Sequence, residues 1–191
     1  MTPSSTRRSW AALVLSCALG CTSSQSDPDQ GEKVAKTPPA SGAAEPAGKQ
    51  ATPAKQVATA ESHGFNDQIA WRGLDEGFAE AKKSGRPLML LVHASWCPKC
   101  KKLKPSFNSS ALTELSRKFV MVNADQDLSP EVEVHAPDGN YVPRILFFEP
   151  GGTLDSSIQN PGRNRFRYFY MPHDDLVGTM KQALERHAPN L

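Results

Sequence analysis

Beyond residue 61, apolar residues form short continuous runs that are separated by longer polar stretches. Short apolar runs bounded by turn residues are typical of central strands that are buried on both faces. We expect three such strands, PLMLLV at 87–92, FVMVN at 119–123 and ILFF at 145–148. The polar stretch 124–140 predicts a long loop, and the turn EPGG at 149–152 predicts a short strand near Leu154.

Helices are predicted at three places. Between residues 69 and 81, apolar side chains recur near helical spacing, and Gly85 suits the C-terminal cap. A second helix is expected after Ser95, which can cap it, with Pro98 in its first turn and a kink at Pro105. A closing helix carries an apolar stripe formed by Leu176, Val177, Met180 and Leu184. Strands that alternate with helices predict an α/β fold.

Residues 1–21 have the pattern of an export signal. Two arginines at 7 and 8 precede an apolar stretch, 10–19, which is too short to span a bilayer as a mature helix. The segment Ala18-Leu19-Gly20-Cys21 resembles a bacterial lipobox, so we expect Cys21 to be lipidated. The alternatives are a rival lipobox frame that ends at Cys17, an ordinary cleaved signal, and a twin-arginine signal.

Residues 22–61 predict a disordered tether between this signal and a folded domain. They contain five prolines, three glycines and nine alanines, and no aromatic residue. Such a composition cannot bury enough apolar surface to offset the chain entropy that folding removes. We therefore expect the domain to lie in the bacterial cell envelope, held by a lipid and facing the periplasm. Thr22, rather than Asp, after Cys21 favours the outer membrane.

The predicted domain, residues 62–191, is nearly neutral. It holds 16 Lys and Arg against 15 Asp and Glu, a formal charge of +1, which gives no reason to expect nucleic acid as a partner. Its one basic and aromatic string, RFRYFY at 165–170, alternates with period two. Alternation of this kind favours a strand with one buried face over a base-stacking surface.

The number and spacing of the cysteines limit the kinds of site that the domain can form. Once the signal is removed, Cys97 and Cys100 are the only thiols of the predicted domain. A structural zinc site normally has four ligands, and no second Cys-x-x-Cys occurs, although His63 and His93 could complete a site. A structural disulfide that closes so small a loop would constrain the unfolded chain very little. A reactive dithiol is therefore the favoured interpretation, and metal binding is the alternative.

The surroundings of the dithiol favour a thiolate at Cys97. The expected second helix begins here, and Cys100 follows one turn later on the same face. Unpaired amides at the start of the helix, together with Lys99 and the lysines that follow, favour negative charge on the sulfur. We expect Pro98 and Lys99 to tune the site, lowering the pKa of Cys97 and making the dithiol more oxidising.

These motifs together resemble the thioredoxin fold. A strand is followed by Trp96-Cys97-Pro98-Lys99-Cys100, a helix with Pro105, a second strand, and Tyr141-Val142-Pro143 at the start of a third. More narrowly, SGRPLMLLVHASWCPKCKKLKPSF, LSRKFVMVNADQD and PDGNYVPRILFFEPGG are similar to the small single-domain thioredoxins of the endoplasmic reticulum and to the anterior gradient proteins. This resemblance implies a central mixed β-sheet flanked by helices.

The resemblance also implies roles for individual residues. Cys97 would attack a substrate disulfide, and Cys100 would resolve the mixed disulfide that forms. Pro143 would follow a cis peptide bond beside the dithiol. Trp96 would flank the site as an aromatic side chain, and Val142 would offer its backbone to a bound polypeptide.

One position departs from the family pattern. Thioredoxin and protein disulfide isomerase carry a buried acid that accepts a proton from the second thiol, whereas this chain has Leu91. His93 follows two residues later and is expected on the same face of the strand. A lone histidine in a strand is more often a packed residue than a proton shuttle.

The sequence therefore predicts a thiol-disulfide oxidoreductase that acts on cell-envelope proteins through Cys97 and Cys100, without a cofactor. Its expected partners are proteins with disulfides or thiols, a redox partner, and the membrane through its lipid. The composition does not fix the direction of electron flow. The competing hypotheses are a copper or zinc carrier that uses the two thiols, and a chaperone-like binding module in which the dithiol is dispensable.

Overall fold

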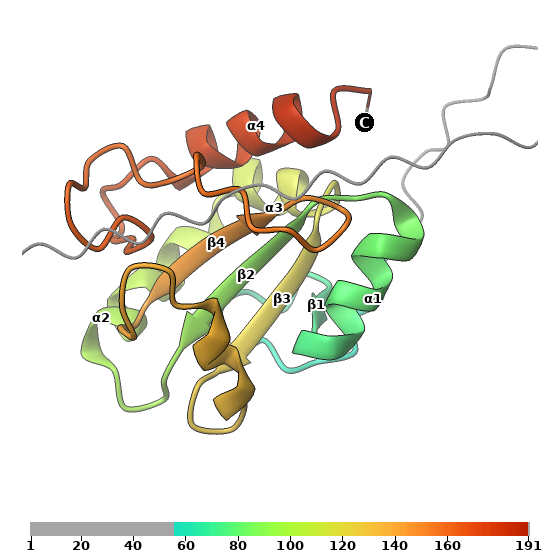
Figure 1. Cartoon of the computed structure of the whole chain (residues 1–191). Helices are drawn as coiled ribbons and strands as arrows, with labels where there is room; N and C mark the ends of the chain where they lie inside the picture. Colours follow the sequence, from blue (N-terminus) through green and yellow to red (C-terminus); the bar gives the residue numbers. More distant parts are fainter. Residues whose placement is uncertain (1–55, 191) are drawn as a thin grey trace, which may run out of the picture. The chain divides into compact units, whose positions relative to one another are not determined.

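The computed structural model of the chain describes residues 56–190 (Figure 1). The predicted signal segment 1–21, its lipidation site Cys21 and residues 22–55 of the predicted tether lie outside the described residues. Within the described part, none of the helices has the length and apolar character needed to cross a bilayer.

Within residues 56–190, a mixed sheet of four strands forms the centre of the fold (Figure 1). Their order across the sheet is β1 (Trp71–Arg72), β3 (Val120–Asp125), β2 (Leu88–His93) and β4 (Arg144–Phe148). β1 and β2 run parallel to β3, and β4 runs antiparallel to β2. The α/β class, the mixed sheet and the three expected strands are thus confirmed.

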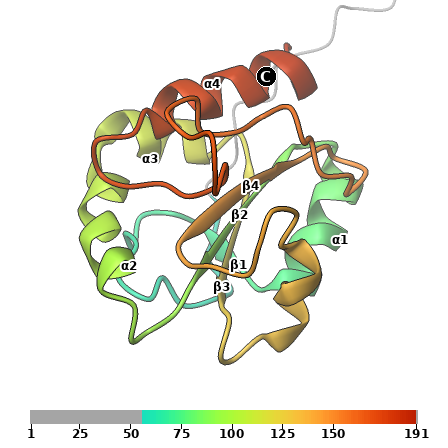
Figure 2. The same ribbon diagram turned by 60° about the vertical axis from the view of Figure 1, so that its left-hand side comes forward.

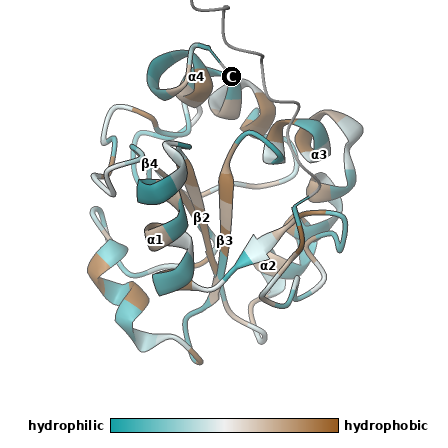
Figure 3. Cartoon of the chain, turned by 90° about the vertical axis from the view of Figure 1, so that its right-hand side faces the viewer, coloured by the Kyte–Doolittle hydropathy of each residue, from teal (hydrophilic) through white to brown (hydrophobic). Residues whose placement is uncertain are grey.

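Helices cover both faces of this sheet (Figure 2). They are α1 (Leu74–Ser84), α2 (Pro98–Leu103), α3 (Ser110–Ser116) and α4 (Leu176–His187), with the 3-10 helices η1 (Lys104–Asn108) and η2 (Pro130–His135). Because side chains alternate along a strand, β2 contributes to two cores. Met89 and Leu91 pack with α2, α3 and α4, whereas Leu88, Leu90 and Val92 pack with α1 and η2. Hydrophobic residues, which are brown in Figure 3, are accordingly concentrated in β2 and β3.

The first helix is shorter than its apolar pattern predicts. Ile69 and Trp71 are buried, but Trp71 pairs with Met121 in the sheet, and the helix begins only at Leu74. Gly85 ends the helix as expected, in the left-handed conformation with φ 69°. Gly77 lets the helix approach β3 closely, because a Cβ there would lie 2.2 Å from Val122 Cγ2.

The second predicted helix changes type where a kink was expected. α2 ends at Leu103, and the chain continues through Pro105 as η1, since proline cannot donate the hydrogen bond that an α-helix interior requires. α3 then begins after Ser109, whose hydroxyl accepts a hydrogen bond from the Leu112 N–H at 3.2 Å.

Three other predictions need correction. The expected loop 124–140 contains η2, and the expected strand near Leu154 is a single bridge to Phe148. The string 165–170 buries Tyr168 and Tyr170, as its alternation predicts, but it forms no strand. It instead supplies a single carbonyl to the edge of β4, because the Ile145 N–H donates to the Tyr168 oxygen at 2.8 Å.

The folded part begins earlier than the predicted boundary at residue 62. The Thr59 N–H donates to the Trp71 carbonyl at 2.9 Å, and the Val57 carbonyl accepts from Arg72 Nη1 at 2.7 Å. Residues 56–61, assigned to the tether from their composition, therefore lie along β1. Their side chains hold them as well, since Gln56 Nε2 donates to the Arg117 carbonyl at 2.9 Å and the Thr59 hydroxyl donates to Glu76 at 2.6 Å.

Candidate active site

The two cysteines of the domain lie where β2 ends and α2 begins. A disulfide joins Cys97 to Cys100. Cys97 occupies the capping position of α2, Pro98 opens the helix, and Cys97 Sγ accepts the Cys100 N–H at 3.1 Å. When the pair is reduced, this amide remains available to stabilise negative charge on Cys97.

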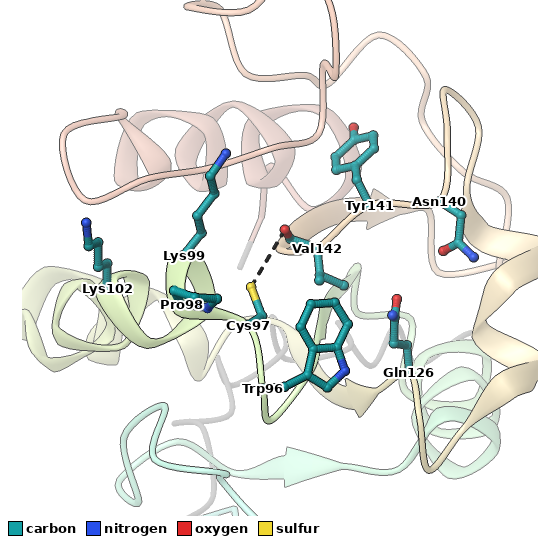
Figure 4. Close-up of a pocket in the computed structure, with 9 residues that line it drawn as sticks. All are labelled: Trp96, Cys97, Pro98, Lys99, Lys102, Gln126, Asn140, Tyr141 and Val142. Carbon is teal, nitrogen blue, oxygen red and sulfur yellow. Dashed lines mark hydrogen bonds between the residues drawn. The ribbon is translucent and has the colours of Figure 1, made fainter.

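The segment before β4 faces this disulfide. Cys97 Sγ lies 3.8 Å from the carbonyl oxygen of Val142, as Figure 4 shows. The peptide bond between Val142 and Pro143 is cis, in agreement with the family resemblance. The Val142 N–H has no hydrogen-bond partner among the described residues. An extended chain that passed over Cys97 could pair with this amide.

An open cavity of about 440 Å³ lies over Cys97 (Figure 4). It is lined by Trp96, Cys97, Pro98, Lys99, Lys102, Gln126, Asn140, Tyr141 and Val142. The structure thus gathers five of the sequence-predicted residues, from Trp96 to Lys99 together with Val142, around one cavity. Both cysteines are buried, Cys97 at 3% and Cys100 at 1% exposed, but only Cys97 lines the cavity.

Trp96 forms an exposed wall of this cavity. Its side chain is 60% exposed, and its Nε1–H donates to Asp127 Oδ2 at 2.7 Å. A large apolar side chain that is held in place but open to solvent is suited to contact a partner.

The position of the missing acid is filled by an apolar side chain. Leu91 is fully buried, and the polar residue on its face of β2 is His93, which is 2% exposed. His93 Nδ1 lies 3.7 Å from Asp125 Oδ2, because the parallel register places Asp125 beside it. The His93 ring also packs against Phe65, with centroids 5.1 Å apart.

Burial lowers the pKa of His93 to about 4, and it outweighs the opposite effect of the Asp125 carboxylate. Charges on His63 and Lys104 lower this pKa further. His93 is therefore neutral at pH 7. A group of such low basicity is a weak acceptor for the proton of a thiol, so His93 does not replace the missing acid as a strong base.

The low pKa of His93 predicts a pH-dependent stability. An unfolded histidine has a pKa near 6.5, so between about pH 6.5 and pH 4 the unfolded chain binds the additional proton, and stability falls as the pH is lowered. We expect this one residue to account for roughly 3 kcal/mol across that interval. Urea unfolding at a series of pH values should show a shallower decline for His93→Phe than for the wild type. Parallel declines would mean that folding does not lower the pKa of His93.

Several residues of this region were not anticipated from the sequence. Asp125 was assigned to the expected loop 124–140, but β3 extends to it and the parallel register then places it beside His93. Gln126 and Asn140 are loop residues with no motif to mark them. Arg144 was missed because a basic residue next to an apolar run normally lies in solvent, whereas here it is fully buried.

No candidate metal centre is visible in the part of the chain that the structure describes, where no three His, Cys, Asp or Glu side chains are grouped to hold an ion. His63 and His93, which could have completed a zinc site, pack against each other with ring centroids 4.9 Å apart and their planes tilted by 55°. Cys97 and Cys100 form a disulfide that packs with apolar core side chains beneath the open cavity, near the unpaired backbone amide of Val142.

Comparison with known proteins finds relatives among the thioredoxin-like and anterior gradient proteins. A family model described as thioredoxin-like matches residues 70–150. Anterior gradient protein 3 of Mus musculus is 38% identical over 133 residues, which covers 64% of this chain and 76% of the relative. Anterior gradient protein 2 homolog of Homo sapiens is 35% identical over 133 residues, which covers 65% of this chain and 71% of the relative.

Solved structures were matched as well. A DsbH oxidoreductase superposes with a TM-score of 0.46 at 18% identity, over 72% of this chain and 92% of that chain. A disulphide isomerase from Xylella fastidiosa Temecula1 superposes with a TM-score of 0.35 at 24% identity, over 42% of this chain and 66% of that chain.

Proposed function

The chain belongs to the family of thioredoxin-like proteins that includes the anterior gradient proteins, and we propose that it is a thiol-disulfide oxidoreductase acting through Cys97 and Cys100. One observation carries this proposal. The two cysteines form a disulfide at the start of α2, and Cys97 lies under an open cavity beside the unpaired amide of Val142.

In the reducing direction, the Cys97 thiolate attacks one sulfur of a substrate disulfide. A mixed disulfide forms and the other substrate sulfur leaves as a thiolate, which takes a proton from water. Cys100 then loses its proton and attacks Cys97 Sγ, so the second substrate thiol departs and the Cys97–Cys100 disulfide forms. Two electrons pass from the dithiol to the substrate. The oxidising direction is the reverse of these steps.

The substrate of this proposal is a polypeptide in extended conformation. The Val142 N–H can donate to a substrate carbonyl, and Trp96 offers an apolar contact next to the reacting sulfur. This backbone contact does not depend on the substrate sequence, so it is compatible with several client proteins.

We also propose that the domain works in the bacterial cell envelope, anchored through Cys21. The support is the sequence of residues 1–61 alone, namely a basic start, a short apolar stretch, a lipobox-like end and a tether. Partition of the mature protein into detergent, and its loss in Cys21→Ser, would test this location.

The activity is tested by insulin reduction, measured beside a metal titration of the reduced protein. We expect catalysed reduction of insulin in the presence of a small dithiol, and no activity in the Cys97→Ser/Cys100→Ser double variant. The metal titration separates the competing carrier function. Tight stoichiometric binding of copper or zinc, without insulin reduction, would replace this proposal by a metal carrier.

A further inference from the structure

The charged side chains that line the cavity over Cys97 have one sign. Its lining contains Lys99 and Lys102 and no carboxylate. Both lysines lie on the same side of Cys97, and Trp96 lies on the other side (Figure 4). Lysines near Cys97 favour its thiolate, but this effect does not require both of them to lie on one side of the sulfur.

Lys99 is held in position rather than free in solvent. Its Nζ lies 5.1 Å from the centroid of the Phe169 ring, and Arg163 Cζ lies 5.2 Å from the same centroid. Arg163 is neutralised by Asp174, with Nη2 and Oδ2 2.7 Å apart. Within residues 56–190, neither Lys99 nor Lys102 pairs with a carboxylate. Their charges remain available to a ligand.

The basic surface continues beyond the cavity. Tyr141, which lines it, packs against Phe166 with ring centroids 4.8 Å apart, and Phe166 is 41% exposed. Arg165 Cζ in turn lies 4.8 Å from the Phe166 centroid and makes no ion pair within the described part of the chain. Lys99, Lys102 and Arg165 are called the basic rim below.

The opposite side of the cavity carries negative charge. Asp127 accepts the hydrogen bond of the Trp96 side chain there, and it is exposed. A bound chain therefore meets positive charge on one side of Cys97 and negative charge on the other. Opposite charges steer association and raise its rate, whereas like charges lower it.

We propose that the basic rim selects client polypeptides with acidic side chains next to the cysteine that reacts with Cys97. This inference rests on the proposed oxidoreductase function and adds a substrate preference to it. A polypeptide fits better than a small anion, because the free Val142 amide and the exposed rings of Trp96 and Phe166 extend the contact surface beyond the lysines.

The test uses matched pairs of disulfide-linked peptides that are identical except for glutamates or lysines on one side of the cysteine. The charges precede the cysteine in one pair and follow it in the other, because only one side of the bound chain faces the basic rim. Their rates of reduction by the protein are each divided by the rate with a small uncharged dithiol, which corrects for the intrinsic reactivity of the peptides. We expect the wild type to prefer the acidic peptide of one pair roughly tenfold at low salt and to lose most of this preference at high salt.

Charge reversal of the rim provides the decisive variant. Lys99→Glu/Lys102→Glu should invert the ratio of the two rates, while the matched control Lys82→Glu/Lys83→Glu, with the same charge change at exposed positions at the end of α1, should preserve it. A change in the pKa of Cys97 alters both rates alike and cancels in the ratio. The ratio therefore reports the substrate contact and not the reactivity of the thiol.

The other outcomes separate the two proposals. A ratio near one in both pairs, or a ratio that the rim variant leaves unchanged while both peptides are reduced, would overturn the acidic preference and leave the oxidoreductase standing. Reduction of glutathione disulfide faster than either peptide would overturn the choice of a polypeptide as the ligand. If neither peptide nor insulin is reduced, the oxidoreductase function itself fails.

Discussion

Cys100→Ser is expected to accumulate covalent complexes with client proteins, whereas Cys97→Ser accumulates none. Cys97 lines the cavity and faces Val142, so its sulfur is the one that a substrate disulfide can reach. Cys100 packs into the core beneath α2 and can attack only the sulfur of Cys97. Without Cys100, the mixed disulfide has no intramolecular route to resolution and persists.

Non-reducing electrophoresis of extracts that contain each variant measures this difference directly. Bands that disappear on treatment with a reductant should be seen with Cys100→Ser, and they should be absent with Cys97→Ser and with the double variant. Turnover in the insulin assay should be lost completely in all three. Equal trapping by the two single variants would show that the assignment of attacking and resolving cysteine is wrong.

Arg144→Met is expected to cost about 3 to 5 kcal/mol of folding free energy. The Arg144 side chain is fully buried at the start of β4. It donates to the His135 carbonyl at 3.0 Å, to Asn140 Oδ1 at 3.1 Å, to the Tyr141 carbonyl at 2.8 Å and to the Val132 carbonyl at 3.3 Å. Methionine fills the space but donates no hydrogen bond, so four acceptors would be left without this partner.

The Arg144→Met substitution should disturb the active site as well as lower the stability of the fold. The acceptors of Arg144 lie in residues 132–141, and this segment carries Asn140, Tyr141 and Val142 to the cavity. We therefore expect Arg144→Met to weaken the trapping of clients by Cys100→Ser even at temperatures where the variant is folded. Val142 would no longer be held at a fixed distance from Cys97.

Urea unfolding measures the cost, with Arg165→Met as the matched control. Arg165 is exposed, so its replacement by the same residue should change the stability by no more than about 0.5 kcal/mol. Arg144→Lys should fall between wild type and Arg144→Met, because one ammonium group cannot reach all four acceptors. A loss below about 1 kcal/mol in Arg144→Met would mean that the packing of His135 between Phe78 and Phe148 holds the segment by itself.

The dithiol, the central strands and the start of α2 could be predicted from short stretches of sequence. The apolar runs identified β2, β3 and β4, because a buried strand must be apolar on both of its faces whatever else surrounds it. Pro98 marked the start of α2, because the rules for the first helical turn are local, but the cap is Cys97 and not Ser95, which was expected to cap the helix. The pair Cys97 and Cys100 was already confined to one turn of that helix, so its disulfide required no distant contact.

Other features of the fold depend on contacts between segments that are far apart in the sequence. Trp71 and Arg72 belong to a helical pattern, yet they form β1 because their backbone pairs with Met121 and Val122 some fifty residues later. Residues 56–61 have the composition of a tether, yet backbone hydrogen bonds fix them along that edge strand. Composition describes side chains, and it does not reveal which backbone groups will find a partner.

The α/β fold and the dithiol at the start of a helix follow from local sequence patterns, because apolar runs, caps and spacing act over a few residues. The surroundings of the dithiol depend on tertiary contacts. The tertiary structure buried Arg144 among carbonyl groups of the segment that precedes it and placed Asp125 beside His93. It also brought Arg165 next to Phe166, which packs against Tyr141 of the cavity. The energy of a charged side chain depends on its neighbours in space, and those neighbours come from elements that are far apart along the chain.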